Sequence, residues 1–146
     1  MKITEILLIF FMICVTLGFT FFYQSKNSEP MVCFENNCFS VEIADDVNER
    51  TKGLMFRENM DKDRGMFFIF EQEGVYPFWM KDTILPLDII WMNSEREIVF
   101  IKENAEPYNI IPINPEKDAL YVLEINAGES NKIGLKVGQV VSFRGR

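Results

Sequence analysis

The stretch Phe78–Ile90 reads F-W-M-K-D-T-I-L-P-L-D-I-I, and the expected fold is organised around it. Two apolar runs, Phe78-Trp79-Met80 and Leu87–Trp91, flank a short polar insert. Aromatic and β-branched residues fit a half-buried pleated surface, so both runs are predicted to be strands. Pro86 has no N–H to give to a sheet ladder, which places it at the start of the second strand or in the bend before it.

Four polar residues belong to this stretch, and the flanking strands would hold them close to a buried sheet: Lys81, Asp82, Thr83 and Asp88. Charged groups in such a setting must be paired or solvated, because burying an unpaired charge costs on the order of several kcal/mol. A polar site is therefore expected here.

Upstream, Met31–Phe34 and Cys38–Ala44 are predicted strands joined by the turn Glu35-Asn36-Asn37. Cys33 and Cys38 flank this turn, and their spacing suits a disulfide across a hairpin in an oxidising compartment. Two unpaired thiols are the alternative. The chain has no histidine and no further cysteine beyond Cys14, so we expect neither a metal site nor a cofactor.

The remaining elements follow from local signals. Asp45 or Asp46 can cap a short helix over Val47–Lys52, which Gly53 would stop. Further strands are predicted at Gly65–Phe70, Glu97–Lys102, Ala119–Asn126 and Gln139–Phe143, with a short helix within Ala127–Leu135 and a long proline-containing loop over residues 103–118. The count is about seven strands and two short helices, which predicts a single compact α+β domain, predominantly β, with a curled or barrel-like sheet.

The first part of the chain has a different character. Ile6–Phe22 contains no charged residue, and a helix of that length would span roughly 26 Å, at the short end of what crosses a bilayer. We predict that residues 6–22 form a transmembrane helix, that residues 1–29 are an anchor and linker, and that residues 30–146 form the domain. The amino terminus and Lys2, offset by Glu5, lie before the span, and Lys26 is the only base soon after it, which slightly favours a cytoplasmic N-terminus and a domain outside the cytoplasm. A cleaved signal peptide and a secreted domain are the alternative.

The net charge of −7 belongs to the predicted domain, because Lys2 and Lys26 offset Glu5 and Glu29 in the first segment. An acidic domain without a run of Lys or Arg argues against binding to a nucleic-acid backbone. No nucleic-acid partner is therefore expected.

The absence of histidine leaves carboxylates, amines and guanidinium groups as the candidates for chemistry. Asp88 and Glu124 lie within apolar strands, with Arg50, Arg57 and Lys81 as possible counterions. Two nearby carboxylates can divide the roles of acid and base between them. Alternatively, these groups form a buried network that ties the helix to the sheet and has no catalytic purpose.

Four ordered motifs resemble those of the DUF192 family: E-R-T-K-G-L-M-F-R (Glu49–Arg57), G-M-F-F-I-F (Gly65–Phe70), F-W-M-K-D-T-I-L-P-L-D-I-I (Phe78–Ile90) and Y-V-L-E-I-N-A-G (Tyr121–Gly128). The resemblance covers roughly Phe39 to Phe143. It implies a compact α+β fold with much β structure, often exported behind a signal or anchor, and it carries no established activity.

The positions that match the polar motif positions of the family are Arg50, Arg57, Lys81, Thr83, Asp88 and Glu124. Asp82 departs from the pattern, because the family usually has Asn there. An amide donates and accepts hydrogen bonds, whereas a carboxylate only accepts. The resemblance therefore leaves a donor role at Asp82 in doubt.

Three hypotheses follow for function. The leading one is a membrane-anchored, extracytoplasmic binding or accessory module for an unknown ligand or protein, with a polar site near Lys81–Asp88. The second is a small hydrolase-like enzyme that uses Asp88 and Glu124 as acid and base. The third is a protein-interaction module that uses the proline-rich loop 103–118.

Overall fold

The computed structural model describes residues 11–15 and 29–145, and the domain is the compact unit Pro30–Arg144. This unit contains seven strands and two short helices, as predicted: β1 (Met31–Phe34), β2 (Asn37–Ala44), α2 (Val47–Lys52), β3 (Arg64–Gly74), β4 (Leu87–Met92), β5 (Ile98–Ala105), β6 (Ala119–Asn126), α3 (Glu129–Lys132) and β7 (Ser142–Arg144). The sequence therefore predicted the class correctly, a predominantly β domain.

Local chemistry explains the first elements. Cys33 and Cys38 face each other across the β1–β2 hairpin and form the predicted disulfide. Asp46 caps α2 in a reciprocal capping box with Glu49, which satisfies two backbone N–H groups at the start of the helix. Gly53 ends α2 at a φ of 48°, a conformation that glycine adopts at little cost.

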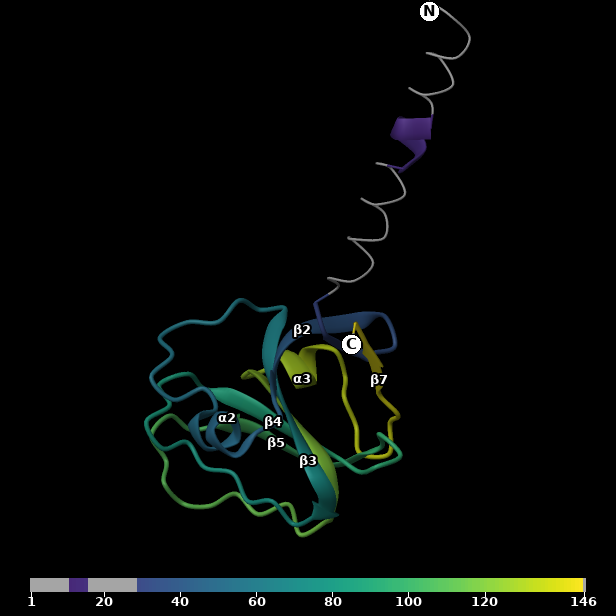
Figure 1. Ribbon diagram of the computed structural model, residues 1–146. Helices are drawn as coiled ribbons and strands as arrows, with labels where there is room; N and C mark the ends of the chain where they lie inside the picture. Colours follow the sequence, from purple (N-terminus) through teal and green to yellow (C-terminus); the bar gives the residue numbers. More distant parts are fainter. Residues whose placement is uncertain (1–10, 16–28, 146) are drawn as a thin grey trace, which may run out of the picture. The chain divides into compact units, whose positions relative to one another are not determined.

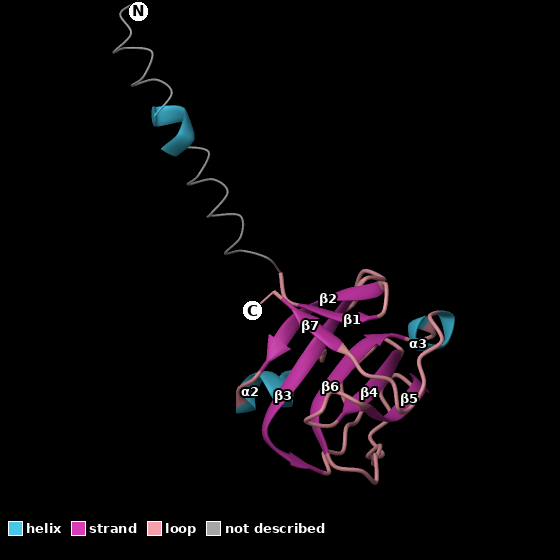
Figure 2. Cartoon of the chain, turned by 90° about the vertical axis from the view of Figure 1, so that its right-hand side faces the viewer, coloured by secondary structure: helices cyan, strands magenta, loops and turns pink. Residues whose placement is uncertain are grey.

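All seven strands belong to one sheet in the order β5-β4-β6-β3-β2-β1-β7. The pairs are antiparallel except β2–β3, where the chain crosses over through α2 and runs parallel. Figures 1 and 2 show how strongly the sheet curls. The start of β5 and the turn before it bond the segment just before β7, through Ile98 N to Gln139 O and Val141 N to Arg96 O. The outer strands therefore meet at one corner, which confirms the curled sheet.

Apolar side chains are buried on both faces of the sheet. One face, which we call the α3 face, carries a cluster that includes Phe67, Ile90 and Leu123. The other, which we call the α2 face, carries a second cluster that includes Phe68, Trp91 and Val122. Every residue of β4 is buried, because successive side chains of a strand point to opposite faces and both faces are covered here.

Phe78-Trp79-Met80 was predicted to be a strand, and that prediction is wrong. Within this run only Phe78 makes a bridge, to Ile113. The reason lies in the sheet, because β5 and β6 already pair with the two edges of β4. The run instead crosses the α2 face as a loop and buries Met80 against it.

Other boundaries differ more modestly. β3 continues four residues beyond its predicted end, to Gly74, and β5 takes the first three residues of the predicted loop 103–118. The helix expected within Ala127–Leu135 is limited to Glu129–Lys132, and the last strand to Ser142–Arg144.

The predicted transmembrane helix over residues 6–22 falls largely outside the described residues. Residues 11–15 are helical, and the rest of that segment is not described. No helix in the described part of the chain is long and apolar enough to cross a membrane.

Candidate functional site

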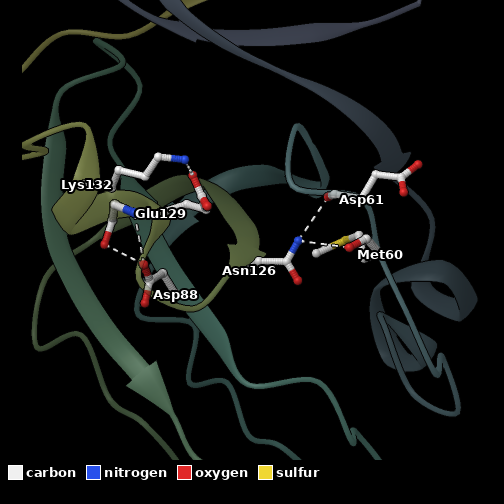
Figure 3. Close-up of polar contacts among 7 residues, drawn as sticks. Met60, Asp61, Asp88, Asn126, Glu129 and Lys132 are labelled. Carbon is white, nitrogen blue, oxygen red and sulfur yellow. Dashed lines mark hydrogen bonds and ion pairs between the residues drawn. The ribbon is translucent and has the colours of Figure 1, made fainter.

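Asp88 is completely buried in β4 and lies on the α3 face. Its Oδ2 accepts hydrogen bonds from Ser130 N at 3.0 Å and Ser130 Oγ at 2.6 Å, drawn as dashed lines at Asp88 in Figure 3. Its Oδ1 accepts a hydrogen bond from Asn104 N at 2.9 Å. The N-cap of α3, Gly128, has no side chain to offer, so Asp88 bonds the first turn of α3 from a distant strand. Its partners are uncharged donors, and Asp88 connects β4, β5 and α3.

Neighbouring polar contacts also join segments that are distant in the chain. Asn126 Nδ2, at the end of β6, donates to Met60 O at 3.1 Å and Asp61 O at 2.9 Å (Figure 3). Within α3 itself, Lys132 Nζ lies 2.9 Å from Glu129 Oε2. The two Asn126 contacts use backbone carbonyls, and they hold the loop at Met60 and Asp61 to the sheet.

Glu124 lies on β6 beside Asp88 in the sheet, but on the opposite face. Its cross-strand neighbours are Met66 on β3 and Ile89 on β4. The residue is 5% exposed, and burial raises the pKa of its carboxyl to about 8. At neutral pH the carboxyl is therefore mostly protonated.

The Glu124 carboxyl keeps a small contact with solvent. Among the described residues, no side-chain oxygen that is sealed from solvent lacks a hydrogen-bond partner. Glu124 accepts no hydrogen bond from any described residue and is shifted by burial alone, so its remaining exposure must include the carboxyl oxygens. A buried acid that has no partner but is open to solvent is typical of a functional site more than of a core.

A polar pocket with a volume of about 460 Å³ lies next to Glu124, and its lining residues are Glu42, Ile43, Glu49, Lys52, Gly53, Met55, Phe56, Arg57 and Met66. Arg57 donates to both carboxylate oxygens of Glu42 through its two terminal guanidinium nitrogens, with Nη2 2.8 Å from Oε2. These hydrogen bonds hold the pKa of Glu42 below its ordinary value and raise that of Arg57. The ion pair leaves little net charge at this edge.

Gly53 separates the polar pocket from Glu124. A β-carbon at this position would lie 3.4 Å from Phe68 Cζ and 3.9 Å from Glu124 Oε2. The missing side chain therefore leaves room for about one methyl group between Gly53, which lines the polar pocket, and the Glu124 carboxyl.

A second pocket lies on the other side of α2, and we call it the aromatic groove. It has a volume of about 380 Å³ and is lined by Val47, Arg50, Thr51, Phe70, Tyr76, Pro77, Phe78 and Trp79. Phe70 and Tyr76 stack with centroids 3.6 Å apart, and the Arg50 guanidinium lies 5.3 Å from the Phe70 centroid. Arg50 Nη1 donates to Ile69 O at 2.9 Å.

The polar insert of the opening stretch forms a loop near this groove. Lys81 Nζ lies 5.5 Å from the Trp79 ring centroid, within the range of a cation–π contact. Thr83 is buried and its Oγ1 donates to Lys81 O at 3.0 Å. Asp82 has a φ of 51° and its carbonyl accepts from Phe56 N. Asn and Asp both tolerate this left-handed conformation, which gives a backbone reason for either residue there.

The structure thus divides the predicted site residues. Asp88 lies on the α3 face. The other predicted site residues lie on the α2 face: Arg50, Arg57, Lys81, Asp82, Thr83 and Glu124. Asp88 and Glu124 are not brought together as an acid–base pair. The predicted network of Asp88 and Glu124 with Arg50 and Lys81 is not formed either, because Asp88 binds Ser130 and Asn104.

Sequence reasoning missed several of the site residues. Ser130 and Asn104 carry no local signal, because their contacts with Asp88 depend on the sheet register. Phe70 ended the predicted strand Gly65–Phe70, and Tyr76 had a weaker signal, an aromatic cluster around a proline at Tyr76–Trp79.

Together, the curled sheet and the two pockets beside α2 define a small, predominantly β domain, without a group of metal ligands in its described residues. The chain belongs to the DUF192 family (Uncharacterized ACR), whose family model matches residues 31–143.

Curated relatives of this chain include UPF0127 proteins of Thermococcus species. The protein from Thermococcus gammatolerans is 29% identical over 108 residues, which cover 70% of this chain and 65% of the relative. The protein from Thermococcus kodakarensis is 27% identical over a segment of the same length. The match thus spans slightly less than two thirds of these relatives.

Two solved structures share the fold. A protein of unknown function from Novosphingobium aromaticivorans has a TM-score of 0.73 and 36% identity, covering 77% of this chain and 82% of its own. A protein from Sinorhizobium meliloti has a TM-score of 0.74 and 34% identity, covering 80% of this chain and 93% of its own. These similarities support the fold and the family, and they carry no activity to this chain.

Proposed function

We propose that this protein is an extracytoplasmic binding module, anchored to a membrane through residues 6–22, whose ligand site is the aromatic groove beside α2. The observation that carries the proposal is that aromatic rings and Arg50 converge on an open groove. Binding pockets are typically concave, mostly apolar and equipped with a few polar groups that orient the ligand. The proposed ligand site thus includes the aromatic groove as well as the polar loop near Lys81 that the sequence indicated.

The charges around the groove indicate the kind of ligand. Arg50 uses only Nη1 for the hydrogen bonds that it makes with described residues, so its other donors remain for a ligand. Lys81 contacts a ring and forms no ion pair with a described residue. Two cations that have no carboxylate partner among the described residues, in a domain with a net charge of −7, favour an anionic ligand with a flat or apolar part.

The hairpin disulfide supports the proposed location. Disulfides such as Cys33–Cys38 persist in oxidising compartments and are rare in the cytoplasm. We therefore place the domain outside the cytoplasm, and a secreted form released by signal cleavage remains the alternative.

The groove can be tested with a matched set of small probes: 3-phenylpropionate, 3-phenylpropylamine and 3-phenylpropanol. Trp79 is 46% exposed, whereas Trp91, the other tryptophan, is fully buried. Quenching by acrylamide therefore reports mainly on Trp79. We expect 3-phenylpropionate to protect Trp79 from quenching more strongly than the amine or the alcohol does.

Arg50→Gln should abolish this preference for the carboxylate. Lys136→Gln is the control, since Lys136 is exposed on the loop that follows α3, away from the groove. Equal protection by all three probes, unchanged in Arg50→Gln, would contradict the proposal.

The proline-rich loop supports a second candidate function. Within the described residues, Tyr108, Ile110 and Ile111 are strongly exposed on this loop, and exposed apolar clusters often mark protein-interaction surfaces. The same loop bonds the polar loop, through Tyr108 N to Thr83 O and Met80 N to Asn109 O. A partner protein bound to the proline-rich loop would therefore lie next to the polar loop that contains Lys81. The test is to change Ile110 and Ile111 together to Ser. We expect the original chain to capture a partner protein by cross-linking and the double variant to lose that partner.

A further inference from the structure

We propose that the polar pocket beside α2 is a binding site for an aliphatic primary ammonium group, which passes Gly53 and Met66 and pairs with the Glu124 carboxylate. This site lies across α2 from the aromatic groove. The inference goes beyond the proposed function and does not depend on it.

The first step of the argument is access. Gly53 and Met66 line the polar pocket, and both are neighbours of Glu124, Gly53 through space and Met66 across the sheet. Because Gly53 has no side chain, Glu124 Oε2 lies only 3.9 Å from the point where a β-carbon would stand. The carboxyl also keeps a small solvent contact. A narrow group can therefore reach Glu124 from the polar pocket.

The second step concerns charge. Glu124 is a carboxyl without a hydrogen bond or ion pair from any described residue, and its burial disfavours the ionised form. A ligand that brings a positive charge supplies the missing counterion. Ionised Glu124 then forms a charge-assisted hydrogen bond, and its proton is released to solvent. An anionic ligand would gain no such pairing.

The third step concerns the other charged groups around the pocket. Glu42 and Arg57 neutralise each other, and the Glu49 carboxylate accepts from the backbone at the start of α2. Further cations near the pocket are Lys52 on α2 and Arg64 on β3, which both lower the pKa of Glu42, and Lys102 on β5, which lies opposite Ile89. None of them contributes to the pKa of Glu124, which burial alone raises. The pocket therefore carries no dominant charge that would repel an ammonium group.

The walls indicate the rest of the ligand. Apolar side chains of Ile43, Met55, Phe56 and Met66 line the pocket, which suits an alkyl chain behind the ammonium group. A free alkylamine and a lysine side chain share this chemistry. The probes are accordingly n-butylammonium and Nα-acetyl-lysine methylamide, with butyrate and n-butanol as isosteric controls.

The test is titration calorimetry of the full chain, kept in a non-ionic detergent, in phosphate and in MOPS. These buffers differ in ionisation enthalpy, so the number of protons released can be measured. We expect n-butylammonium to release close to one proton at pH 7. Its affinity should rise about 50-fold from pH 6 to pH 8 and then level off, because binding requires ionised Glu124. Butyrate and n-butanol should show neither effect. If Nα-acetyl-lysine methylamide also binds, the ligand is a lysine side chain of a protein. If only n-butylammonium binds, the ligand is a free alkylamine.

Glu124→Gln keeps the shape of the side chain and removes its titration, so n-butylammonium binding should be lost. Glu103→Gln is the control, because Glu103 is exposed on β5 and is not among the residues that line the polar pocket. The proposal is overturned if n-butylammonium binds without proton release or if butyrate binds equally well. It is also overturned if Glu124→Gln retains pH-dependent binding. Should Glu124→Gln fail to fold, the proton count of the unmodified chain still decides.

Discussion

Asp88 and Glu124 lie on paired strands, one residue out of register, and therefore on opposite faces of the sheet. Asp88 faces Ile125 across the ladder, whereas Glu124 faces Ile89. Because side chains alternate along a strand, one carboxylate bonds α3 and the other approaches the polar pocket beside α2. Their roles are independent, and substitutions at the two positions should have different effects.

Asp88→Asn should destabilise the fold. The amide would point a donor at N–H or O–H groups of Ser130 and Asn104, leaving buried donors without acceptors. We expect a loss of about 2–4 kcal/mol and a melting temperature lower by roughly 10 °C, measured by thermal melting. Ser130→Ala, which removes one of the three bonds, should cost about 1 kcal/mol. A melt of Asp88→Asn within a degree or two of the original would instead point to a functional Asp88.

Glu124 should make the fold less stable as pH rises. Below the ordinary pKa of 4.5 the Glu124 carboxyl is protonated in the folded and the unfolded state, so its contribution to the free energy of unfolding is fully present there. Between 4.5 and about 8 only the folded state keeps the proton, so stability falls, in total by roughly 5 kcal/mol, and is level above that range. Denaturant unfolding of the original chain and Glu124→Gln across pH measures the difference. Parallel pH curves for the two proteins would show that Glu124 titrates normally. The opposite contribution of Glu42, whose pKa is lowered, cancels in this comparison.

Gly65→Ala should be more damaging than an ordinary strand substitution. A β-carbon at Gly65 would lie 2.5 Å from the backbone oxygen of Glu124, so β3 and β6 must separate. We expect a loss of about 3 kcal/mol or more. Gly74→Ala on the same strand is the matched control, since its nearest contact is the Tyr76 ring at 3.4 Å, and it should stay within about 1 kcal/mol. Equal unfolding midpoints in denaturant would contradict this expectation.

Cys33 and Cys38 should be disulfide-bonded in protein taken from its native compartment. The double change to Ser should cost only about 2 kcal/mol, because the bridge closes a short loop. Alkylation followed by mass spectrometry checks the bond. Two free thiols would argue against an extracytoplasmic domain as well.

Removal of Met1–Ser28 should leave a folded domain that needs no detergent. Both apolar clusters and all seven strands of the described residues lie within Pro30–Arg144, so this unit has a hydrophobic core of its own. Circular dichroism and size-exclusion chromatography would check this. Aggregation or an unfolded spectrum would refute the division into anchor and domain.

Short-range signals account for the parts of the fold that the sequence predicted well. The predicted aspartate cap of Val47–Lys52, which is Asp46, the stop at Gly53 and the bounds of Ala119–Asn126 all agree with the structure. In each case the residues that form the element also supply its caps, turn or alternation. The number of strands and the hairpin disulfide followed from the same kind of local information.

The sequence by itself determined the β-rich class, the hairpin, α2 and the set of polar residues worth testing. Only the tertiary structure decided which strands pair, that Phe78–Met80 crosses the α2 face as a loop, and that Asp88 and Glu124 point apart. The physical reason is that a strand needs a free partner edge, and a side chain's face depends on register. Both are set by residues far away in the chain. The gap at Gly53 and the buried, unpaired state of Glu124 likewise exist only once α2 lies on the sheet.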